Sequence, residues 1–174
     1  MKTLARGREL GTTTVEAPTP PARPLMAAAN VVVRLLLRSP LHCWLSDTVL
    51  LLTYTGRKSG RRYTNPVSYS REGDVVTVFT YRSWWRNLRG GAPVRVEIKR
   101  RQFDGMADAI SDDQPAIAVS LLAHLWEHPS LAREYNVPLD AEGRPDPIAV
   151  RHAAPFVVMV RIQLTAACRD RAPD

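Results

Sequence analysis

TVLLLTYTGRKSG, the stretch from Thr48 to Gly60, joins an apolar, β-branched run to a short basic turn. The run from Thr48 to Tyr54 is apolar enough for a strand that is buried on both faces. Gly56 and Gly60 then bracket a turn, because glycine adopts backbone conformations that other residues avoid. We therefore expect a central strand that leads directly into a Gly-Arg-Lys-Ser-Gly loop.

Further strand patterns follow this turn along the chain. Strands are predicted at residues 64–71, 75–80, 94–99, 102–110 and 156–164. Glu72-Gly73-Asp74 has the composition of a hairpin turn, which makes its two flanking strands antiparallel. Apolar and charged residues alternate strictly at 94–99, so one face of that strand should be exposed to solvent. These strands predict a mainly β fold with flanking helices (α+β), built around a small antiparallel barrel.

Two helices are predicted beside the strands. Leu25 to Arg38 has apolar residues at helical spacing and ends before Pro40. We expect this helix to pack on the barrel. Peripheral contact with an anionic membrane is the alternative, because arginines flank its apolar face. A second helix covers about Pro115 to Trp126, with Ser111 or Asp112 as its N-cap.

The length of the chain favours a single folded domain. We expect a flexible, proline-rich leader at residues 1–24, a barrel domain at residues 25–166 and a C-terminal tail at residues 167–174. The part after the second helix, around Gly143 to Pro147, is expected to be a loop. No apolar run is long enough to span a bilayer, and no secretory signal is apparent.

The balance of charges favours an anionic partner. The chain has 24 Lys and Arg against 17 Asp and Glu, a net charge of +7, and the guanidinium of arginine donates paired hydrogen bonds to phosphate or carboxylate. Trp84 and Trp85 could stack on bases, but no basic-aromatic repeat accompanies them, so nucleic-acid binding is not expected. Cys43 and Cys168 have neither disulfide-framework nor zinc-site spacing, which fits a cytoplasmic protein.

Two histidines near the end of the second helix are possible metal ligands. His124 and His128 stand four residues apart, with Glu127 directly before the second. This order differs from H-E-x-x-H, and no third ligand is apparent. We interpret them as structural histidines near a helix end and expect no metal site.

The basic turn carries the strongest chemical signal. Arg57, Lys58 and Ser59 place two cations and a hydroxyl between glycines whose backbone N–H groups can approach an anion. Phosphate is the natural ligand for such a group. The pattern is neither a Walker A loop nor the G-x-G-x-x-G fingerprint. A hairpin turn that is merely basic is the alternative from these residues alone.

Several motifs together resemble the deazaflavin-dependent nitroreductase and quinone reductase family, whose members have an FMN-binding-like split β-barrel. The resemblance covers most of the chain. It consists, in order, of the apolar strand with its basic turn, Asn65-Pro66-Val67, the Glu72-Gly73-Asp74 hairpin, Trp84-Trp85-Arg86-Asn87-Leu88, an alternating strand and the closing strand after Ala154-Pro155.

The resemblance implies an oxidoreductase that binds coenzyme F-420, a 5-deazaflavin, with FMN as the alternative cofactor. The basic turn would hold the anionic tail, and the Trp block would line the cofactor cleft. The cofactor-binding residues implied are Arg57, Lys58, Ser59, Gly60, Pro66, Thr80, Trp84 and Asn87. Relatives usually have a longer glycine- and lysine-containing loop before the Trp block. Only Tyr81-Arg82-Ser83 stands here, so Arg82 is expected to replace the missing lysine.

The implied reaction is hydride transfer to a quinone, a nitroaromatic or an activated alkene. A side chain should donate a hydrogen bond to the charge that develops on this small-molecule acceptor, and Tyr135, Tyr81 and Ser68 are the candidates. The chain would act as a monomer or homodimer. A non-catalytic carrier of a flavin, haem or lipid-like ligand on the same barrel is the alternative function.

Overall fold

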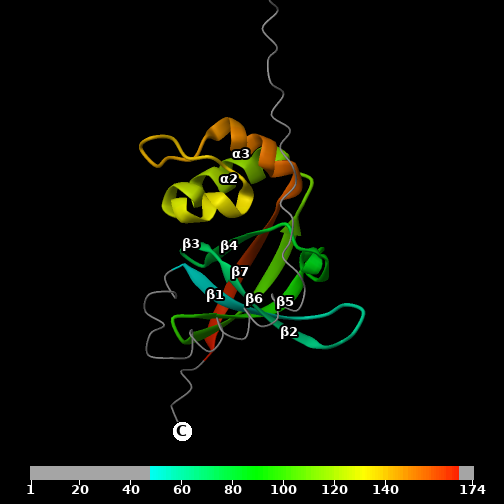
Figure 1. The fold of residues 1–174 in the computed structure, drawn as a ribbon. Helices are drawn as coiled ribbons and strands as arrows, with labels where there is room; N and C mark the ends of the chain where they lie inside the picture. Colours follow the sequence, from blue (N-terminus) through cyan, green and yellow to red (C-terminus); the bar gives the residue numbers. More distant parts are fainter. Residues whose placement is uncertain (1–47, 169–174) are drawn as a thin grey trace, which may run out of the picture.

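The computed structural model describes residues 48–168, and Figure 1 shows them as one curled sheet with helices at one end. Seven strands form the sheet in the order β2-β1-β5-β6-β7-β4-β3, and every neighbouring pair is antiparallel. The strands are β1 Val49–Thr55, β2 Arg62–Ser68, β3 Ser70–Glu72, β4 Val75–Thr80, β5 Ala92–Ile98, β6 Arg101–Ile110 and β7 Val158–Cys168.

The path of the chain explains why this sheet curls into a split barrel. β2 and β3 stand at opposite ends of the strand order, yet only Tyr69 separates them along the chain. A flat sheet would place these strands too far apart for a one-residue connection, because neighbouring strands are roughly 4.8 Å apart. The two ends of the sheet must therefore meet at Tyr69. This confirms the predicted fold class, mainly β with flanking helices and an antiparallel split barrel.

The strand predicted at 64–71 is in fact two strands, and this part of the prediction was wrong. Tyr69 is buried at the corner, and its backbone N–H donates to the Thr48 carbonyl at 3.2 Å. Before the corner the chain pairs with β1, and after it with β4. Strand propensity alone does not reveal such a change of partner, because both halves remain extended.

The interior of the barrel follows the alternation read from the sequence. In β5, Val94, Val96 and Ile98 are buried while Arg95 is exposed. Arg95 forms an ion pair with Asp104 of β6 at 2.8 Å on the outer face. The prediction of one wet face is therefore confirmed.

The pairing of β6 with β7 is interrupted by a bulge between Asp104 and Gly105. A Cβ added to Gly105 would lie 2.7 Å from the carbonyl oxygen of Gln163, which is too close for any side chain. Glycine is thus required by the neighbouring backbone.

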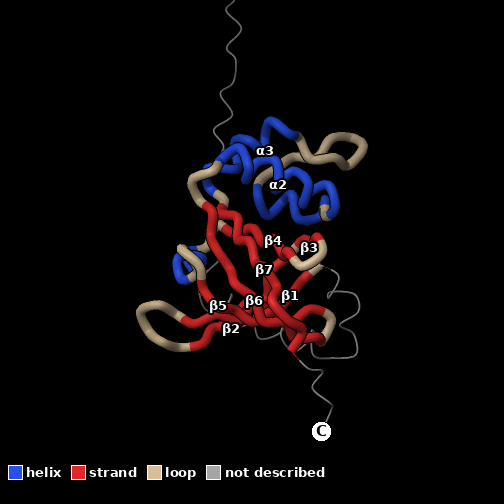
Figure 2. Tube along the Cα trace, turned by 180° about the vertical axis from the view of Figure 1, so that it is seen from behind, coloured by secondary structure: helices blue, strands red, loops and turns tan. Residues whose placement is uncertain are grey.

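The helices pack over one end of the sheet, where Figure 2 shows them grouped beyond the strands. They are α2 Gln114–Glu127 and α3 Pro147–Ala153, with the 3-10 helices η3 Pro129–Tyr135 and η4 Ala154–Phe156. A further 3-10 helix, η2 Ser83–Asn87, lies apart from this group, beside β5 (Figure 2). Ile117, Leu121 and Leu125 of α2 are fully buried in a second core that includes Phe79 and Met159 from the sheet. The helix predicted at about Pro115 to Trp126 is therefore confirmed.

Helix α3 was missed because its region was expected to be a loop. Asp146 accepts a hydrogen bond from the Ile148 backbone N–H at 2.8 Å, and Pro147 begins the helix. An N-cap followed by proline is a regular helix start. The signal was present, but the helix has only 7 residues and offers little periodicity.

The N-cap of α2 is Asp113, so the expectation of Ser111 or Asp112 was wrong. The Asp113 carboxylate accepts from the Ala116 backbone N–H at 3.0 Å. We expect Asp113→Ala to lower the free energy of unfolding by about 1 kcal/mol, the usual effect of losing a cap. Asp112→Ala is the matched control and should leave urea unfolding unchanged. Equal effects of both substitutions would contradict the assignment.

The predicted helix at Leu25 to Arg38, the leader at residues 1–24 and most of the tail at residues 167–174 lie outside the described residues. Within residues 48–168, none of the helices has the length and apolar character needed to cross a bilayer.

Candidate functional site

The turn between β1 and β2 projects from the sheet, as Figure 1 shows beside β2. Two backbone hydrogen bonds of 2.8 Å close it, from Gly60 N–H to the Gly56 carbonyl and from Gly56 N–H to the Arg61 carbonyl. Gly60 has a φ of 65°, in the left-handed region that glycine occupies without strain. The turn therefore has a defined shape that depends on its glycines.

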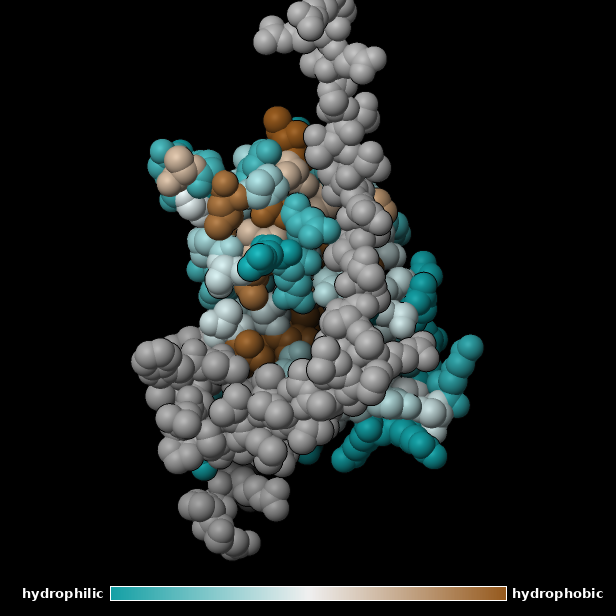
Figure 3. Space-filling model, in the orientation of Figure 1, coloured by the Kyte–Doolittle hydropathy of each residue, from teal (hydrophilic) through white to brown (hydrophobic). Residues whose placement is uncertain are grey.

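Four cationic side chains of this turn are exposed, namely Arg57, Lys58, Arg61 and Arg62. Among the described residues none of them forms an ion pair with a carboxylate. Hydrophilic side chains project beyond the body of the molecule in the corresponding part of Figure 3. The turn therefore presents concentrated positive charge, to which an anionic group would be attracted.

The Trp block is held directly against this turn, although 30 residues separate them. The Arg57 backbone N–H donates to Asn87 Oδ1 at 3.0 Å, and the Arg57 guanidinium donates to the Arg89 carbonyl at 3.2 Å. Asn87 in turn donates to the Trp84 carbonyl at 2.9 Å. Two motifs that were predicted separately to line the cofactor site thus share one hydrogen-bond network.

A stack of aromatic rings lies next to the turn. Tyr54 stacks on Trp84 and on Tyr63, with ring centroids 5.7 and 5.8 Å apart. The Tyr63 hydroxyl lies 3.1 Å from Ser59 Oγ, and Asn65 donates to the Tyr54 hydroxyl at 3.1 Å. Beside these rings lies an open cavity of about 290 Å³. It is lined by Tyr54, Gly56, Lys58, Ser59, Tyr63 and Asn87.

Sequence reasoning missed Tyr54 and Tyr63 as part of this site. They face each other in the register of β1 with β2, which follows from counting outward from the turn. Gly56 is also required here, because a Cβ at this position would lie 2.6 Å from Ser59 Oγ and 2.7 Å from the Tyr63 ring.

The three candidate hydrogen-bond donors gather at the other end of β2. The Tyr135 hydroxyl donates to the Phe79 carbonyl at 3.4 Å and is hydrogen-bonded to Ser68. Burial is the main cause of the raised pKa of Tyr135, and the charge of Glu134 raises it further. The hydrogen bond with Ser68 lowers this pKa, and Tyr81 raises it. Tyr135 is 3% exposed, whereas Ser68 and Tyr81 are half-buried.

The remaining predicted residues lie along or beyond β2. Pro66 is half-buried in β2 and pairs with Leu51. Thr80 is buried at the end of β4, where its hydroxyl accepts from the Arg82 backbone N–H at 3.1 Å. The Arg82 guanidinium packs over the Tyr81 ring, 5.4 Å from its centroid. Arg82 thus lies beside Tyr81, one of the three candidate hydrogen-bond donors. Its role as a substitute for the missing lysine stays a prediction.

The basic turn and the three candidate donor hydroxyls lie at opposite ends of β2. β2 contains 7 residues, so its ends are about 20 Å apart at the usual rise per residue. A ligand that reached both would have to be elongated, with an anionic end at the turn. The fold and this arrangement define a split-barrel protein with an exposed basic turn at one end of β2.

The family model for F420H(2)-dependent quinone reductase matches residues 41–150. The chain belongs to this family of oxidoreductases.

Several solved structures are similar to this chain. A protein described as an F420 reductase has a TM-score of 0.43 and 18% identity over 70% of this chain and 89% of its own. A putative pyridoxamine 5'-phosphate oxidase from Listeria innocua has a TM-score of 0.45 and 13% identity, covering 81% of this chain and 96% of its own. An FMN-binding protein related to that oxidase, from Nostoc punctiforme, has a TM-score of 0.43 and 15% identity, covering 86% and 83%.

The link between the two motifs can be tested at Asn87. We expect Asn87→Ala to weaken binding of coenzyme F-420 by up to about tenfold, because one hydrogen bond that orders the turn contributes roughly 0.5–1.5 kcal/mol. The dissociation constant is measured by fluorescence titration. Gln163→Ala removes an exposed amide on β7 and serves as the control. Equal affinities of both variants would show that Asn87 does not shape the turn for binding.

Proposed function

We propose that this protein is an F-420-dependent reductase that binds the anionic tail of the cofactor at Arg57, Lys58 and Ser59. The acceptor is a quinone, a nitroaromatic or an activated alkene. The observation that carries the proposal is the arrangement along β2, with four exposed cationic side chains at one end and three hydroxyl groups at the other. An elongated cofactor with an anionic tail and a redox-active ring matches both ends.

The basic turn fits a phosphate-bearing tail for three reasons. The Arg57 and Lys58 side chains are exposed and carry no carboxylate partner among the described residues. The Ser59 hydroxyl lines the cavity beside them, and Gly56 leaves open the space that a Cβ would fill. Charge-assisted hydrogen bonds from such groups to phosphate are about twice as strong as neutral ones.

The ring of the cofactor would lie toward the far end of β2, along Pro66 and Thr80, with Trp84 and Asn87 near its linker. When bound, the reduced deazaflavin supplies the hydride. The protein holds the ring and the acceptor close together, which removes much of the entropic barrier to reaction.

Among the three hydroxyl groups, we favour Tyr81 as the group that donates to the acceptor, because Tyr135 is buried and Ser68 is hydrogen-bonded to Tyr135. Tyr135 is buried and already bonded to the Phe79 carbonyl and to Ser68. It is therefore better suited to positioning Ser68 than to contacting a substrate. Tyr81 is half-buried and close enough to Tyr135 to influence its pKa. The phenol of Tyr81 can donate a hydrogen bond to the negative charge that develops on the acceptor.

Titration of the purified protein with F-420, and in parallel with FMN, tests the cofactor. Saturation by F-420 at micromolar concentration, with much weaker binding of FMN, is expected. Preferential binding of FMN would overturn the assignment of the cofactor while leaving the basic turn as a phosphate site.

The acceptor is tested by following oxidation of the reduced deazaflavin after adding a soluble naphthoquinone, a nitroaromatic or a cyclic enone. Turnover with the quinone is expected, because the family is one of quinone reductases. Binding of F-420 without oxidation by any of the three would support a carrier in place of a reductase.

A further inference from the structure

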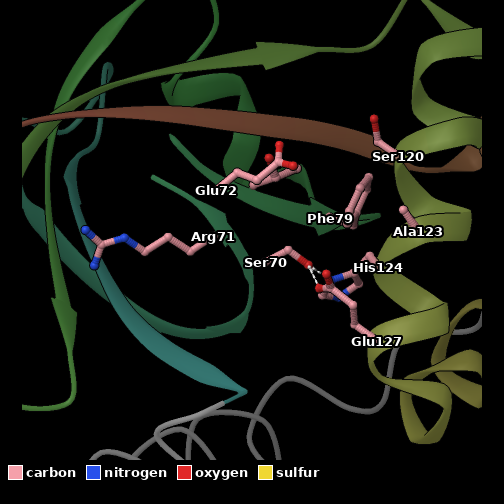
Figure 4. Close-up of a pocket in the computed structure, with 9 residues that line it drawn as sticks. Ser70, Arg71, Glu72, Phe79, Ser120, Ala123, His124 and Glu127 are labelled. Carbon is pink, nitrogen blue, oxygen red and sulfur yellow. Dashed lines mark hydrogen bonds between the residues drawn. The ribbon is translucent and has the colours of Figure 1, made fainter. Parts of the chain in front are cut away.

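Four side chains converge where the end of α2 meets β3, away from the basic turn. Figure 4 shows Ser70, His124 and Glu127 pointing toward one another beside a cavity of about 170 Å³. His128 follows the last residue of α2, and its ring lies 5.3 Å from that of His124. Ligand atoms of His124, Glu127 and His128 all lie within 4.8 Å of one another.

The hydrogen bonds of Ser70 indicate which ring nitrogen of His124 carries a hydrogen. The Ser70 hydroxyl donates to Glu127 Oε2 at 2.9 Å and lies 2.7 Å from His124 Nδ1. A serine hydroxyl has one proton to donate. Since that proton goes to Glu127, Nδ1 of His124 must carry a hydrogen and donate it to Ser70. Nε2 then bears the lone pair of a neutral imidazole.

This lone-pair nitrogen is the unusual feature. His124 is 1% exposed, and its Nε2 has no hydrogen-bond partner among the described residues. An unsatisfied buried polar atom costs roughly 1–3 kcal/mol. A role of His124 in packing alone, against Phe79 at 5.2 Å, leaves this cost unexplained. A bound group that accepts the lone pair of Nε2 would remove this free-energy cost.

We propose that His124, Glu127 and His128 bind a divalent transition-metal ion of the Zn²⁺ class. Two imidazoles and a carboxylate are donors that Zn²⁺ uses, with bonds of about 2.0–2.2 Å. A tetrahedral ion needs ligand atoms roughly 3.3 Å apart at those bond lengths. Glu127 is exposed and His128 half-buried, so the proposed site requires these two side chains to move toward the buried His124.

The surroundings of the three ligands fit this role. Ser70 accepts the Nδ1 hydrogen of His124 and bonds to Glu127, as the outer-shell partners of metal ligands commonly do. Three protein ligands leave one tetrahedral position for water, and the adjoining cavity can hold it. The order of these residues differs from H-E-x-x-H, so no third ligand is apparent from the sequence. The fold shows that Glu127 itself lies beside both histidines.

Metal uptake by the full-length protein tests the proposal without reference to the reductase function. After treatment with a chelator, the protein is titrated with Co²⁺ and the visible ligand-field bands are recorded, followed by displacement with Zn²⁺. One ion per chain, with the intense bands of a tetrahedral site and a rise in melting temperature, is expected.

The variant Glu127→Gln/His128→Gln changes two surface side chains and should fold normally. It should bind Co²⁺ at least about 100-fold more weakly than the unmodified protein, because two of three ligands are lost. Glu142→Gln/His152→Gln makes the same chemical changes at exposed positions elsewhere and should leave binding unchanged. Ser70→Ala should weaken binding by about 10–100-fold, the usual effect of removing an outer-shell partner.

Two results would overturn the proposal: no stoichiometric uptake of Co²⁺ or Zn²⁺, or equal uptake by the Glu127→Gln/His128→Gln variant and its control. Because F-420 takes no part in these measurements, they succeed or fail independently of the proposed reductase function.

Discussion

The variant Arg57→Ala/Lys58→Ala is expected to bind coenzyme F-420 about 100-fold more weakly than the unmodified protein. Each cation can make a charge-assisted hydrogen bond to the anionic tail, and such bonds contribute about 1.5–3 kcal/mol. Both side chains are exposed, so we take the lower end, about 3 kcal/mol for the pair. A loss of 1.4 kcal/mol is tenfold in affinity. Fluorescence titration at moderate salt measures the change.

The matched control is Arg100→Ala/Arg151→Ala. It removes two exposed arginines that lie outside the turn and its cavity, so the net charge falls equally. F-420 affinity should stay within about twofold, because exposed charges beyond the Debye length of about 8–10 Å are largely screened. If both variants bound F-420 equally weakly, attraction by overall charge would explain the binding, and the turn would lose its assigned role.

Tyr81→Phe is expected to lower kcat for quinone reduction by about 100-fold while leaving F-420 affinity unchanged. Removing one preorganised donor to a developing negative charge costs about 10²–10³ in rate. The substitution keeps the aromatic ring over which the Arg82 guanidinium packs, so the local structure should be retained. Single-turnover oxidation of the bound reduced deazaflavin separates this step from cofactor binding.

Ser68→Ala and Tyr135→Phe complete this test. If Tyr135 acts only by positioning Ser68, its substitution should have a smaller effect on kcat than Tyr81→Phe. A full rate in Tyr81→Phe together with a large loss in Ser68→Ala would transfer the donor role to Ser68. Unchanged rates in all three variants would remove this group of hydroxyls from the mechanism.

Much of the fold was predictable because its signals are local. The apolar run ending at Tyr54 and the glycines of the following turn define β1 and its hairpin without reference to the rest of the chain. The alternation in β5 likewise identifies its buried face. The same turn, followed at the right distances by the Asn-Pro and Trp motifs, was enough to recognise the family that residues 41–150 match.

Short and weakly periodic elements were harder to predict. Helix α3 and the cap at Asp113 depend on one or two residues each, and neighbouring Ser and Asp residues offer equally plausible caps for α2. The split of β2 from β3 at Tyr69 involves no change of local conformation preference. It is a change of pairing partner, which no local pattern records.

Taken by itself, the sequence determined the composition of the sites, namely which cations, hydroxyls and histidines the chain can offer and which local elements carry them. Only the tertiary structure decided which of these meet. Asn87 reaches Arg57 across 30 residues, and Ser70 reaches His124 across 54. The first contact exists because β5, which follows Asn87, pairs with β1, which leads into the turn. The second exists because α2 packs across the end of the sheet beside β3. Such long-range proximity depends on burying the shared core, and local preferences do not encode it.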